Sequence, residues 1–519
     1  MSTLKEDLAR SAEEVRETHI SWVFLHDRSV FKVKKPVDFG FLDFSDVERR
    51  RVACESEVQL NARLAPGVYA GVVPITLRAD GVHELAGSGA VVDWAVHMRR
   101  LSDSERADVR LAEGRLDAEQ IELLARALAR FHRAAPSSAR ISEFGRVACI
   151  ARNVAENFAQ AHSRLAQLVS EGQQRELESW QLGFLERHAQ RFERRIADGR
   201  IRDGHGDLRL EHVYIDARAE PTIIDCIEFN ERFRFADVCA DVAFLSMDLA
   251  FAGRVDLKER LLAAYASESD DHDLYAVVDF YESYRAYVRA KISALGLDSI
   301  DTGAGPSAGP AARQELEQQA RRYFLLALAS ERAADSPARL IAVAGLIASG
   351  KSTLGRAVAA EIAAPSVSSD RVRKSLHGVA ATAPLHDAAF AASYSDAVSE
   401  RVYAEVLRRA EVVLQSGRSV LVDASFRSRA SRAAARDLAR RLNVPFLLIE
   451  CQAPLEVSRA RLVERARGPS ESDGRSQIFD DFVAHYEPIT ELDPAERVVV
   501  DTGGSLEAAL AALRSSGAI

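Results

Sequence analysis

The C-terminal half of the chain alternates between short apolar runs and longer stretches with helical periodicity. The apolar runs predict strands near residues 340–344, 366–369, 419–423, 446–451 and 497–501. The periodic stretches predict helices near residues 352–362, 396–416, 428–441, 455–466, 476–485 and 505–515. This alternation is typical of a parallel sheet covered by helices on both faces. We therefore expect an α/β domain whose ligands gather at the carboxyl ends of the strands.

The N-terminal half shows a different order, with strands first and helices later. The polar segment 1–17 predicts a helix. Apolar alternation then predicts strands at 21–25, 30–34, 72–75 and 90–97, with a helix at 45–64. Helical periodicity dominates the stretches 117–135, 153–197 and 257–295. Strands followed by helices indicate an α+β domain.

A stretch rich in Gly, Ser, Asp and Pro, residues 296–310, predicts the boundary between the two halves. A helix at 311–334 follows it, and we expect this helix to dock one domain on the other. The sequence thus predicts a first domain at 1–300, a linker and connecting helix at 301–337, and a second domain at 338–519.

The strongest motif of the chain lies between the first strand and the first helix of the second domain. The segment Gly345-Leu346-Ile347-Ala348-Ser349-Gly350-Lys351-Ser352 fits the phosphate-loop pattern G-x-x-x-x-G-K-S/T without a mismatch. Its backbone N–H groups and the start of the helix would surround the phosphates of a nucleotide. Lys351 would reach the β- and γ-phosphates, and the Ser352 hydroxyl would bind Mg²⁺. The predicted nucleotide contacts are Gly345, Ala348, Ser349, Gly350, Lys351, Ser352 and Thr353; the alternative is a Gly-rich turn without a nucleotide.

Acidic and basic residues follow the other strands of this domain. Asp370 and Arg373 come after the second strand, and Asp423 ends the third. Asp370 could accept a proton from a substrate hydroxyl, Arg373 could hold a substrate phosphate, and Asp423 could hold Mg²⁺ through water. Helix N-capping is the alternative role for Asp370.

Arginines precede a Gly-Pro-Ser segment further along, which is a candidate lid. They are Arg459, Arg461, Arg465 and Arg467. Such arginines would stabilise negative charge on the transferred group. A solvated helix face is the alternative for each of them.

The first domain carries a second set of phosphoryl-transfer residues. Lys32 lies on a predicted strand and would contact the nucleotide phosphates, with Glu57 preferred over Glu55 as its partner. The alternative is an edge strand with solvated lysines. Asp207 would orient an acceptor hydroxyl, and His212 and Asp225 would bind the metal ion; a packed core histidine is the alternative for His212. Asp237 and Asp241 are expected to anchor these loops structurally.

These residues carry two resemblances. With His205, Gly206, Asp207 and Asp225, residues 1 to about 300 resemble the aminoglycoside phosphotransferase family, which implies a two-lobed, protein-kinase-like fold. His212 departs from that family, which usually has Asn at this position as a magnesium ligand. Residues 338–519 resemble small P-loop kinases, a group that includes polynucleotide kinase, zeta toxins and chloramphenicol phosphotransferase. This second resemblance implies that Asp370 is a general base. The whole chain resembles bacterial fusions of the two domains.

Composition narrows the class of protein. The 519 residues are 47% hydrophobic and 28% charged, and the net charge of −9 argues against a broad basic surface for nucleic acids. The five cysteines contain no C-x-x-C pair, which argues against a disulfide framework or a thiolate zinc site. Without a membrane-length apolar stretch or a signal peptide, we expect a cytoplasmic protein with no membrane partner.

The preferred hypothesis is an ATP-dependent phosphotransferase that uses Mg²⁺ and is active in its C-terminal domain. Its acceptor would be a hydroxyl of a small molecule or of a nucleic-acid end. The alternative, motivated by His212, is a nucleotide-switched regulatory protein whose N-terminal domain is a pseudokinase that binds a partner. Modification of an antibiotic by the N-terminal domain is a third possibility, which rests on fold analogy alone.

Overall fold

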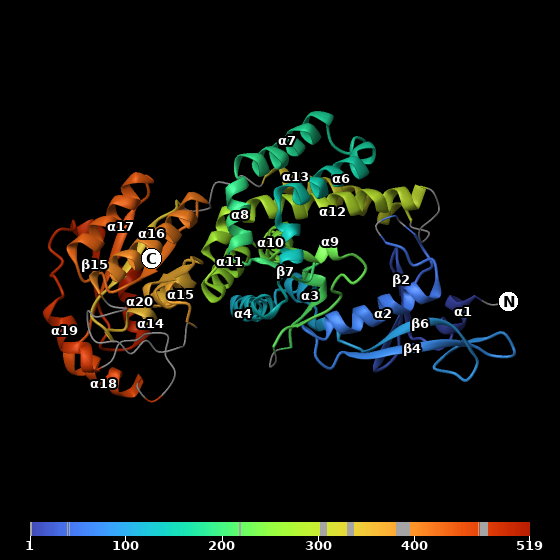
Figure 1. Cartoon of the computed structure of the whole chain (residues 1–519), viewed down its shortest axis with the longest axis horizontal. Coiled ribbons are helices and arrows are strands. Elements are labelled where there is room, and N and C mark those ends of the chain that lie inside the picture. The colour runs from blue at the N-terminus through green and yellow to red at the C-terminus, as the bar shows by residue number, and fades with distance from the viewer. Residues whose placement is uncertain are drawn as a thin grey trace. The chain divides into compact units, whose positions relative to one another are not determined.

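The computed structural model describes residues 3–38, 40, 42–216, 220–301, 309–329, 337–379, 395–465, 467 and 476–519 (Figure 1). The chain divides into two compact units. Unit 1 comprises Met1–Lys258 and Val277–Glu331, and unit 2 comprises Glu259–Ala276 and Arg332–Ile519. The chain therefore enters unit 2 twice, once as a short segment and once for its C-terminal third. The predicted domain boundaries at residues 300 and 338 stay predictions.

Unit 1 begins with a six-stranded antiparallel sheet in the order β1-β2-β3-β6-β4-β5. Its strands are β1 (Glu14–Glu17), β2 (Ser21–Leu25), β3 (Ser29–Lys34), β4 (Tyr69–Leu77), β5 (His83–Leu85) and β6 (Ala90–Arg99). Helix α2 (Val47–Asn61) is N-capped by the Asp46 side chain, which accepts a hydrogen bond from the Arg49 N–H. The predicted N-terminal helix is wrong beyond Ala9: helix α1 (Leu4–Ala9) ends there, and Glu14–Glu17 instead pairs with β2 along the open edge of the sheet.

The rest of unit 1 is mostly helical. Its helices are α3 (Ala107–Ala112), α4 (Ala118–Ala134), α5 (Ala139–Ser142), α6 (Val147–Leu165), α7 (Glu171–Arg187), α8 (Ala189–Ala197), α9 (Glu231–Arg234), α10 (Val238–Phe251), α12 (Val278–Asp301) and α13 (Pro310–Leu328). Two small antiparallel pairs join β7 (Ile201–Asp203) to β10 (Phe235–Asp237) and β8 (Val213–Tyr214) to β9 (Thr222–Ile223). Helix α10 is buried from Val238 to Leu249, and its mainly apolar sequence suits a helix that packs at the centre of a domain.

Helix α12 continues six residues further than the composition indicates. Gly296 was expected to start a linker, but the helix runs through it to Asp301. A Cβ atom on Gly296 would lie 3.4 Å from the Leu316 side chain of α13. The glycine therefore lets two helices pack closely, which composition alone does not distinguish from a turn.

Unit 2 contains the predicted parallel sheet. Its strands are β11 (Leu340–Ala344), β12 (Ser366–Ser368), β13 (Val420–Asp423), β14 (Phe446–Gln452) and β15 (Arg497–Asp501), in the order β12-β13-β11-β14-β15 and all parallel. Its helices are α14 (Lys351–Glu361), α15 (Ser369–Leu376), α16 (Asp396–Gln415), α17 (Arg429–Arg441), α18 (Leu455–Arg465), α19 (Phe479–Ala484) and α20 (Leu506–Ser515). The central strand β11 is buried throughout, because helices cover both of its faces.

The short segment of unit 2 consists of the C-terminal part of α11 (Val255–Ser269) and a 3₁₀ helix at His272–Ala276. This segment is fixed to α16 by two arginines. Arg408 binds the Asp273 carboxylate at 2.8 Å, and Arg409 binds the Asp270 carboxylate at 2.7 Å. Glu405, one turn earlier on α16, holds both guanidinium groups, at 2.7 and 2.8 Å. One carboxylate thus orients the two cations that bind the segment.

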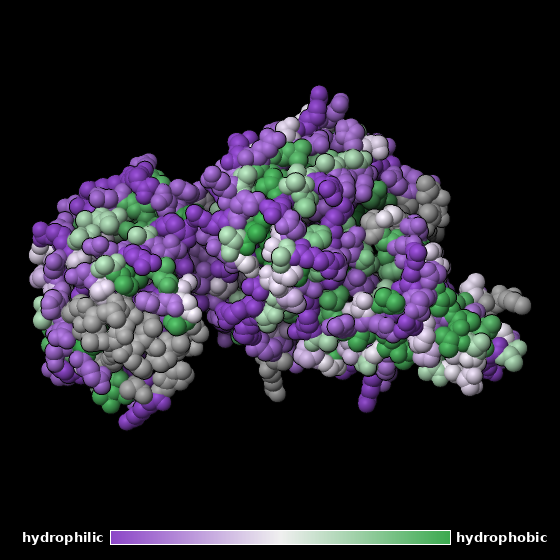
Figure 2. Space-filling view, in the orientation of Figure 1, coloured by the Kyte–Doolittle hydropathy of each residue, from purple (hydrophilic) through white to green (hydrophobic). Residues whose placement is uncertain are grey.

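Hydrophilic residues cover most of the face of the molecule shown in Figure 2. In the part of the chain that the structure describes, no helix combines the length and the apolar character needed to cross a bilayer.

The Glu405 cluster predicts a loss of stability in acid. Burial raises the pKa of Glu405, but Arg408 and Arg409 outweigh it and lower the pKa from 4.5 to about 2. Because the pKa is depressed in the folded state, this stabilisation is present above pH 4.5 and is lost as the pH falls from there towards 2. Glu405→Gln should lower the free energy of unfolding by about 2 kcal/mol at neutral pH, after allowance for solvent screening. It should also weaken the dependence of that free energy on pH in the acid range.

Chemical unfolding between pH 3 and 7 measures the effect. Glu411→Gln on the same helix is the matched control, because Glu411 binds the exposed Arg441 and the Gln415 amide at the surface. We expect the control to change stability by less than about 0.5 kcal/mol. Equal pH profiles for both variants would contradict the prediction.

Candidate functional site

The predicted phosphate loop is a tight turn of main chain between β11 and α14. Gly345 has a φ of 144° and Gly350 a φ of 96°, a region that favours glycine. A Cβ atom on Gly345 would lie 2.5 Å from the Cys451 carbonyl oxygen, so a side chain cannot be accommodated there. Gly350 caps α14 without a side-chain hydrogen bond, which leaves the N–H groups of the first turn available. The turn therefore offers an anion-binding helix start.

Lys351 folds back over this turn. Its Nζ donates to the Leu346 carbonyl oxygen at 2.6 Å. Burial lowers the pKa of Lys351, and the nearby Asp423 carboxylate opposes this shift only in part. A lysine that is desolvated in this way gains an interaction when an anion enters the loop.

A cavity of about 550 Å³ opens in front of the turn. It gathers most of the residues predicted for this domain: Ala348, Gly350, Lys351, Ser352, Thr353, Asp370, Arg373 and Asp423. Gly345 and Ser349 lie behind them in the turn, where Gly345 gives it its shape and Ser349 is buried. The side chains come from the carboxyl ends of β11, β12 and β13, as a parallel sheet dictates.

Asp370 is not the N-cap of its helix. Ser368 has that position in α15, and its hydroxyl faces the Arg371 N–H at 3.5 Å. Asp370 is thus the second residue of α15, with its carboxylate in the lining of the cavity. The alternative role that the sequence allowed for Asp370 belongs to Ser368.

The four arginines of the candidate lid have different surroundings. Arg459 pairs with Asp480, and Arg467 pairs with Glu464 at 2.9 Å on the surface. Arg461 donates to the Thr502 carbonyl oxygen at 2.6 Å behind the loop. Only Arg465 lines the cavity, and its burial lowers its pKa against the opposing charges of Asp370 and Asp423. The Gly-Pro-Ser segment at 468–470 lies outside the described residues.

Sequence reasoning missed several residues of this site. Thr502 follows β15 directly, and its hydroxyl donates to the Ser349 carbonyl oxygen at 2.5 Å, which supports the turn. Its place after a strand at the ligand-binding edge was a usable signal. Other cavity residues carried no recognisable motif: Ser267, Arg356, Arg371, Tyr403 and Arg427.

Unit 1 holds a chain of buried charges near its sheet. Lys32 Nζ lies 2.9 Å from a Glu57 oxygen and 2.5 Å from Asp225 Oδ1, so the predicted pairing with Glu57 is confirmed. Glu55, the other candidate, pairs instead with Arg51 on the exposed face of α2. Lys34, two residues along the strand, is fully buried and binds Glu57 at 2.6 Å and also Glu228.

These charges shift one another's pKa values in opposite directions. Burial raises the pKa of Glu57, but Lys32 and Lys34 reverse this and lower it. Burial raises the pKa of Glu228, and Lys34 compensates only in part. Sequence reasoning missed Lys34 and Glu228, although the alternation that selects Lys32 puts Lys34 on the same face.

Asp207, His212 and Asp225 lie close together. His212 Nδ1 donates to the Asp207 carbonyl oxygen at 2.8 Å, and Nε2 of the same ring lies 3.7 Å from Asp225 Oδ2. Asp225 has a φ of 67°, a region that costs energy for a residue with a side chain. Burial raises the pKa of Asp207, but His212 and Arg209 outweigh it and lower the value, so the carboxylate stays ionised.

Asp237 and Asp241 have the structural role expected of them. The Asp241 carboxylate accepts hydrogen bonds from the N–H groups of His205 at 2.7 Å and Gly206 at 2.9 Å. Asp237 binds the buried Arg195 guanidinium through two hydrogen bonds of 2.8 and 2.6 Å. Asp241 therefore fixes the segment that precedes Asp207, and Asp237 fixes helix α8 through Arg195.

Within the described ranges, no group of three or more His, Cys, Asp or Glu side chains is arranged to hold a metal ion. The predicted metal ligands form two pairs, Ser352 with Asp423 and His212 with Asp225. A hydroxyl and a carboxylate suit Mg²⁺, which typically uses one or two protein ligands together with substrate phosphates and water. An imidazole is a softer ligand than the oxygens that Mg²⁺ prefers. The metal role of these four residues stays a prediction.

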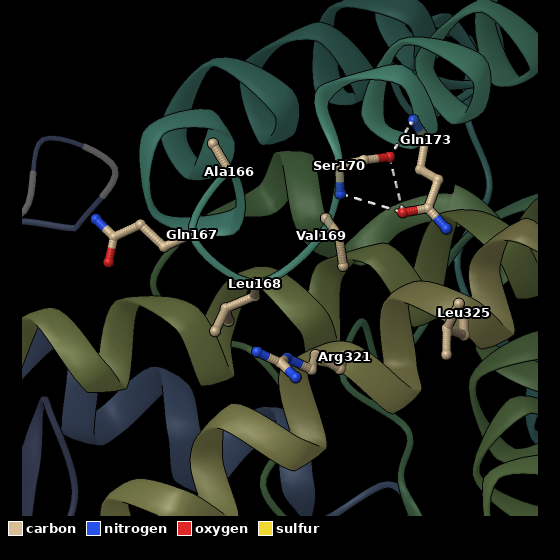
Figure 3. Close-up of a pocket in the computed structure, with 8 residues that line it drawn as sticks. All are labelled: Ala166, Gln167, Leu168, Val169, Ser170, Gln173, Arg321 and Leu325. Atoms are coloured by element: carbon tan, nitrogen blue, oxygen red, sulfur yellow. Dashed lines mark hydrogen bonds between the residues drawn. The ribbon is translucent and has the colours of Figure 1, made fainter.

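A second hollow, of about 400 Å³, lies in unit 1 where the loop between α6 and α7 faces α13 (Figure 3). Its lining includes Leu168, Val169 and Leu325, and Arg321 is its one ionisable side chain. Ser170 and Gln173 bond each other at its rim as the capping box of α7. The remaining lining residues are uncharged.

Comparison with known proteins gives matches in both halves of the chain. A model of the phosphotransferase enzyme family matches residues 22–281, and a model of an AAA domain matches residues 340–489. Uncharacterized proteins of Mycobacterium bovis and Mycobacterium tuberculosis are each 34% identical over 494 residues, which cover 95% of this chain and 93% of theirs.

Solved kinase structures align with part of the chain. A gluconokinase from Sinorhizobium meliloti is 22% identical over 35% of this chain and 93% of its own, with a TM-score of 0.26. A putative kinase from Chloroflexus aurantiacus is 23% identical over 35% of this chain and 98% of its own, with a TM-score of 0.28.

The buried charges of unit 1 predict that Lys34 makes a large contribution to the stability of the fold. Lys34→Met should lower the free energy of unfolding by about 3 kcal/mol, because it leaves Glu57 and Glu228 buried with one counter-charge fewer. Chemical denaturation measures this change. Lys5→Met is the matched control, since Lys5 is 43% exposed and binds Glu17 at the surface. The control should lose less than about 1 kcal/mol, and equal losses in both variants would contradict the assignment.

Proposed function

Because this chain belongs to the phosphotransferase enzyme family, as a member that adds a P-loop kinase-type domain to the family's own domain, we propose that it is an ATP-dependent phosphotransferase whose active centre is the cavity of unit 2. It transfers the γ-phosphoryl group of ATP to a hydroxyl of a small molecule or of a nucleic-acid end. The observation that carries this proposal is the joint lining of one cavity by Lys351, Asp370 and Asp423.

Each residue has a role that its position supports. The main-chain N–H groups of the loop and Lys351 bind the β- and γ-phosphates. Asp370 accepts the proton of the acceptor hydroxyl while the acceptor oxygen bonds to the γ-phosphorus and the bond to the β,γ-bridging oxygen breaks, which releases ADP. Arg465, which lines the same cavity, stabilises the charge of the transferred group.

Ser352 and Asp423 fit a Mg²⁺ ion, the first as a direct ligand and the second through water. When bound, the ion supplies positive charge that offsets the developing negative charge on the phosphate oxygens.

Two substitutions test the proposal. Lys351→Ala should lower ATP consumption by about 100-fold through weaker phosphate binding. Asp370→Asn should lower it by about 100-fold with unchanged ATP affinity, because only the proton acceptor is lost. ATP consumption is measured with a library of hydroxyl compounds and 5′-hydroxyl oligonucleotides.

Asp493→Asn is the matched control, because that carboxylate is exposed and pairs with Arg436. It should leave consumption unchanged. A wild-type protein that consumes no more ATP than Lys351→Ala, with every acceptor, would refute the proposal.

A second candidate function concerns the N-terminal domain. His212 faces Asp225, and Lys32 binds the same carboxylate, so the group that would bind the metal ion already has two cationic or proton-bearing neighbours. This arrangement favours a pseudokinase role, in which the domain binds a partner and nucleotide occupancy acts as a switch.

The combined Asp207→Asn and Asp225→Asn substitutions distinguish the two roles. If unit 1 is a pseudokinase, turnover of ATP by the full-length chain stays within about twofold of wild type, because unit 2 alone performs the transfer. Steady-state ATP consumption with and without each acceptor is the measurement. Selective loss of turnover with one class of acceptor would instead identify a second active site.

A further inference from the structure

Strand β12 is the edge strand of the unit 2 sheet, and its free edge is covered by the short segment 259–276. On its inner side β12 pairs with β13. On its outer side, the Ser366 N–H donates to Ser267 Oγ at 3.0 Å, and His272 Nε2 donates to the Ser366 carbonyl oxygen at 3.1 Å. Both outward-facing main-chain groups of Ser366 therefore have side-chain partners instead of another strand or water.

The same segment also reaches the helix that follows the strand. Arg371, the third residue of α15, donates through Nη2 to the Glu268 carbonyl oxygen at 2.8 Å. Three contacts from neighbouring positions, Ser267, Glu268 and His272, thus hold the strand-to-helix turn at Ser366–Arg371. That turn contains Asp370.

The segment is firmly part of unit 2. Besides the ion pairs of Arg408 and Arg409 described above, Arg418 binds Glu259 at 2.7 Å and stacks over the Tyr275 ring. His272 is 2% exposed. Burial lowers its pKa, which favours the neutral ring that donates through Nε2. A neutral, buried donor gives a hydrogen bond of fixed direction.

Ser267 also lines the cavity, unlike Glu268 and His272, the other two residues of the segment that hold the turn. The residues that match the AAA-domain model begin at 340 and do not include Ser267, which lies within the stretch matched by the phosphotransferase model. A serine from the first domain's sequence thus contributes to the cavity of the second.

We propose that Ser267 is a positioning residue of the unit 2 site: together with Glu268 and His272 it fixes the β12–α15 turn, and so sets where Asp370 and Arg373 meet the acceptor. The proposal rests on the phosphotransferase function proposed above. The phosphate loop follows a different strand, β11, and none of these contacts touches it. Loss of Ser267 should therefore impair phosphoryl transfer and leave nucleotide binding intact.

Hydrogen–deuterium exchange of the full-length protein tests the structural part without any nucleotide. Ser267→Ala should speed exchange in the peptide covering residues 366–373 by about fivefold, the effect of one net hydrogen bond, with no change at 345–353. Ser267→Thr keeps the hydroxyl oxygen and should restore protection. The matched control is Ser269→Ala, because the Ser269 hydroxyl bonds the Tyr265 carbonyl oxygen within its own helix. Unchanged exchange in Ser267→Ala, or no recovery in Ser267→Thr, would overturn the proposal.

ATP turnover and nucleotide affinity test the functional part. Ser267→Ala should lower the kcat of ATP consumption by about tenfold, while the Kd of a fluorescent ATP analogue in magnesium buffer stays within twofold of wild type. Ser267→Thr should recover most of the kcat, and Ser269→Ala should match wild type. A lower Tm with unchanged kcat would show a merely structural role and overturn the proposal. A wild-type protein that neither binds nor consumes ATP would refute the proposed function instead, and the exchange measurement separates the two failures.

Discussion

The main-chain turn between β11 and α14 is the constraint on which the unit 2 site depends. The carbonyl oxygen of Cys451 approaches the Gly345 backbone so closely that a Cβ atom there would lie 2.5 Å from it. Position 345 can therefore hold only a residue without a side chain, and in this conformation the start of α14 lines the cavity. In the proposed function, Lys351, Asp370 and Asp423 share a target because this turn gives the phosphates one place to bind.

The two units use charge in different ways. In unit 1, Lys32, Lys34, Glu57 and Glu228 pair with one another inside the protein; the lysines outweigh the burial of Glu57 and offset that of Glu228 in part. In unit 2, Lys351 and Arg465 are desolvated, and burial lowers the pKa of each. A site whose cations are only partly compensated gains from an incoming anion, whereas cations that already have carboxylate partners, such as Lys32 and Lys34, gain little. This contrast is the physical basis for assigning phosphoryl transfer to unit 2.

Much of the fold could be predicted from periodicity, and the reasons for the exceptions are local. The five parallel strands could be predicted from short apolar runs, and the helices between them from the periodic stretches that separate these runs. Such alternation is typical of a parallel sheet covered on both faces. The segment Glu14–Glu17 was predicted as helix because its polar residues carry no strand pattern, and only its pairing with β2 makes it a strand. Gly296 resembled a boundary because a glycine for close helix packing has the same composition signal as a glycine in a turn.

The candidate site was predictable where a motif linked neighbouring residues, as in the phosphate loop. It was not predictable where the contact joined distant parts of the chain. Ser267 precedes Ser366 by 99 positions, and no pattern in either segment indicates that they meet. Thr502 and Lys34 are intermediate cases. The sequence shows that Thr502 directly follows a strand and that Lys34 lies on the same strand face as Lys32, but it does not show which groups they contact.

The crossing of the chain into unit 2 through residues 259–276 limits how the C-terminal domain can be separated or exchanged. A fragment cut at residue 338 lacks the partners of Ser366 and presents a bare strand edge, which can pair with the same edge of another molecule and aggregate. Gene truncation at the apparent linker would thus remove a piece of the second domain together with the first.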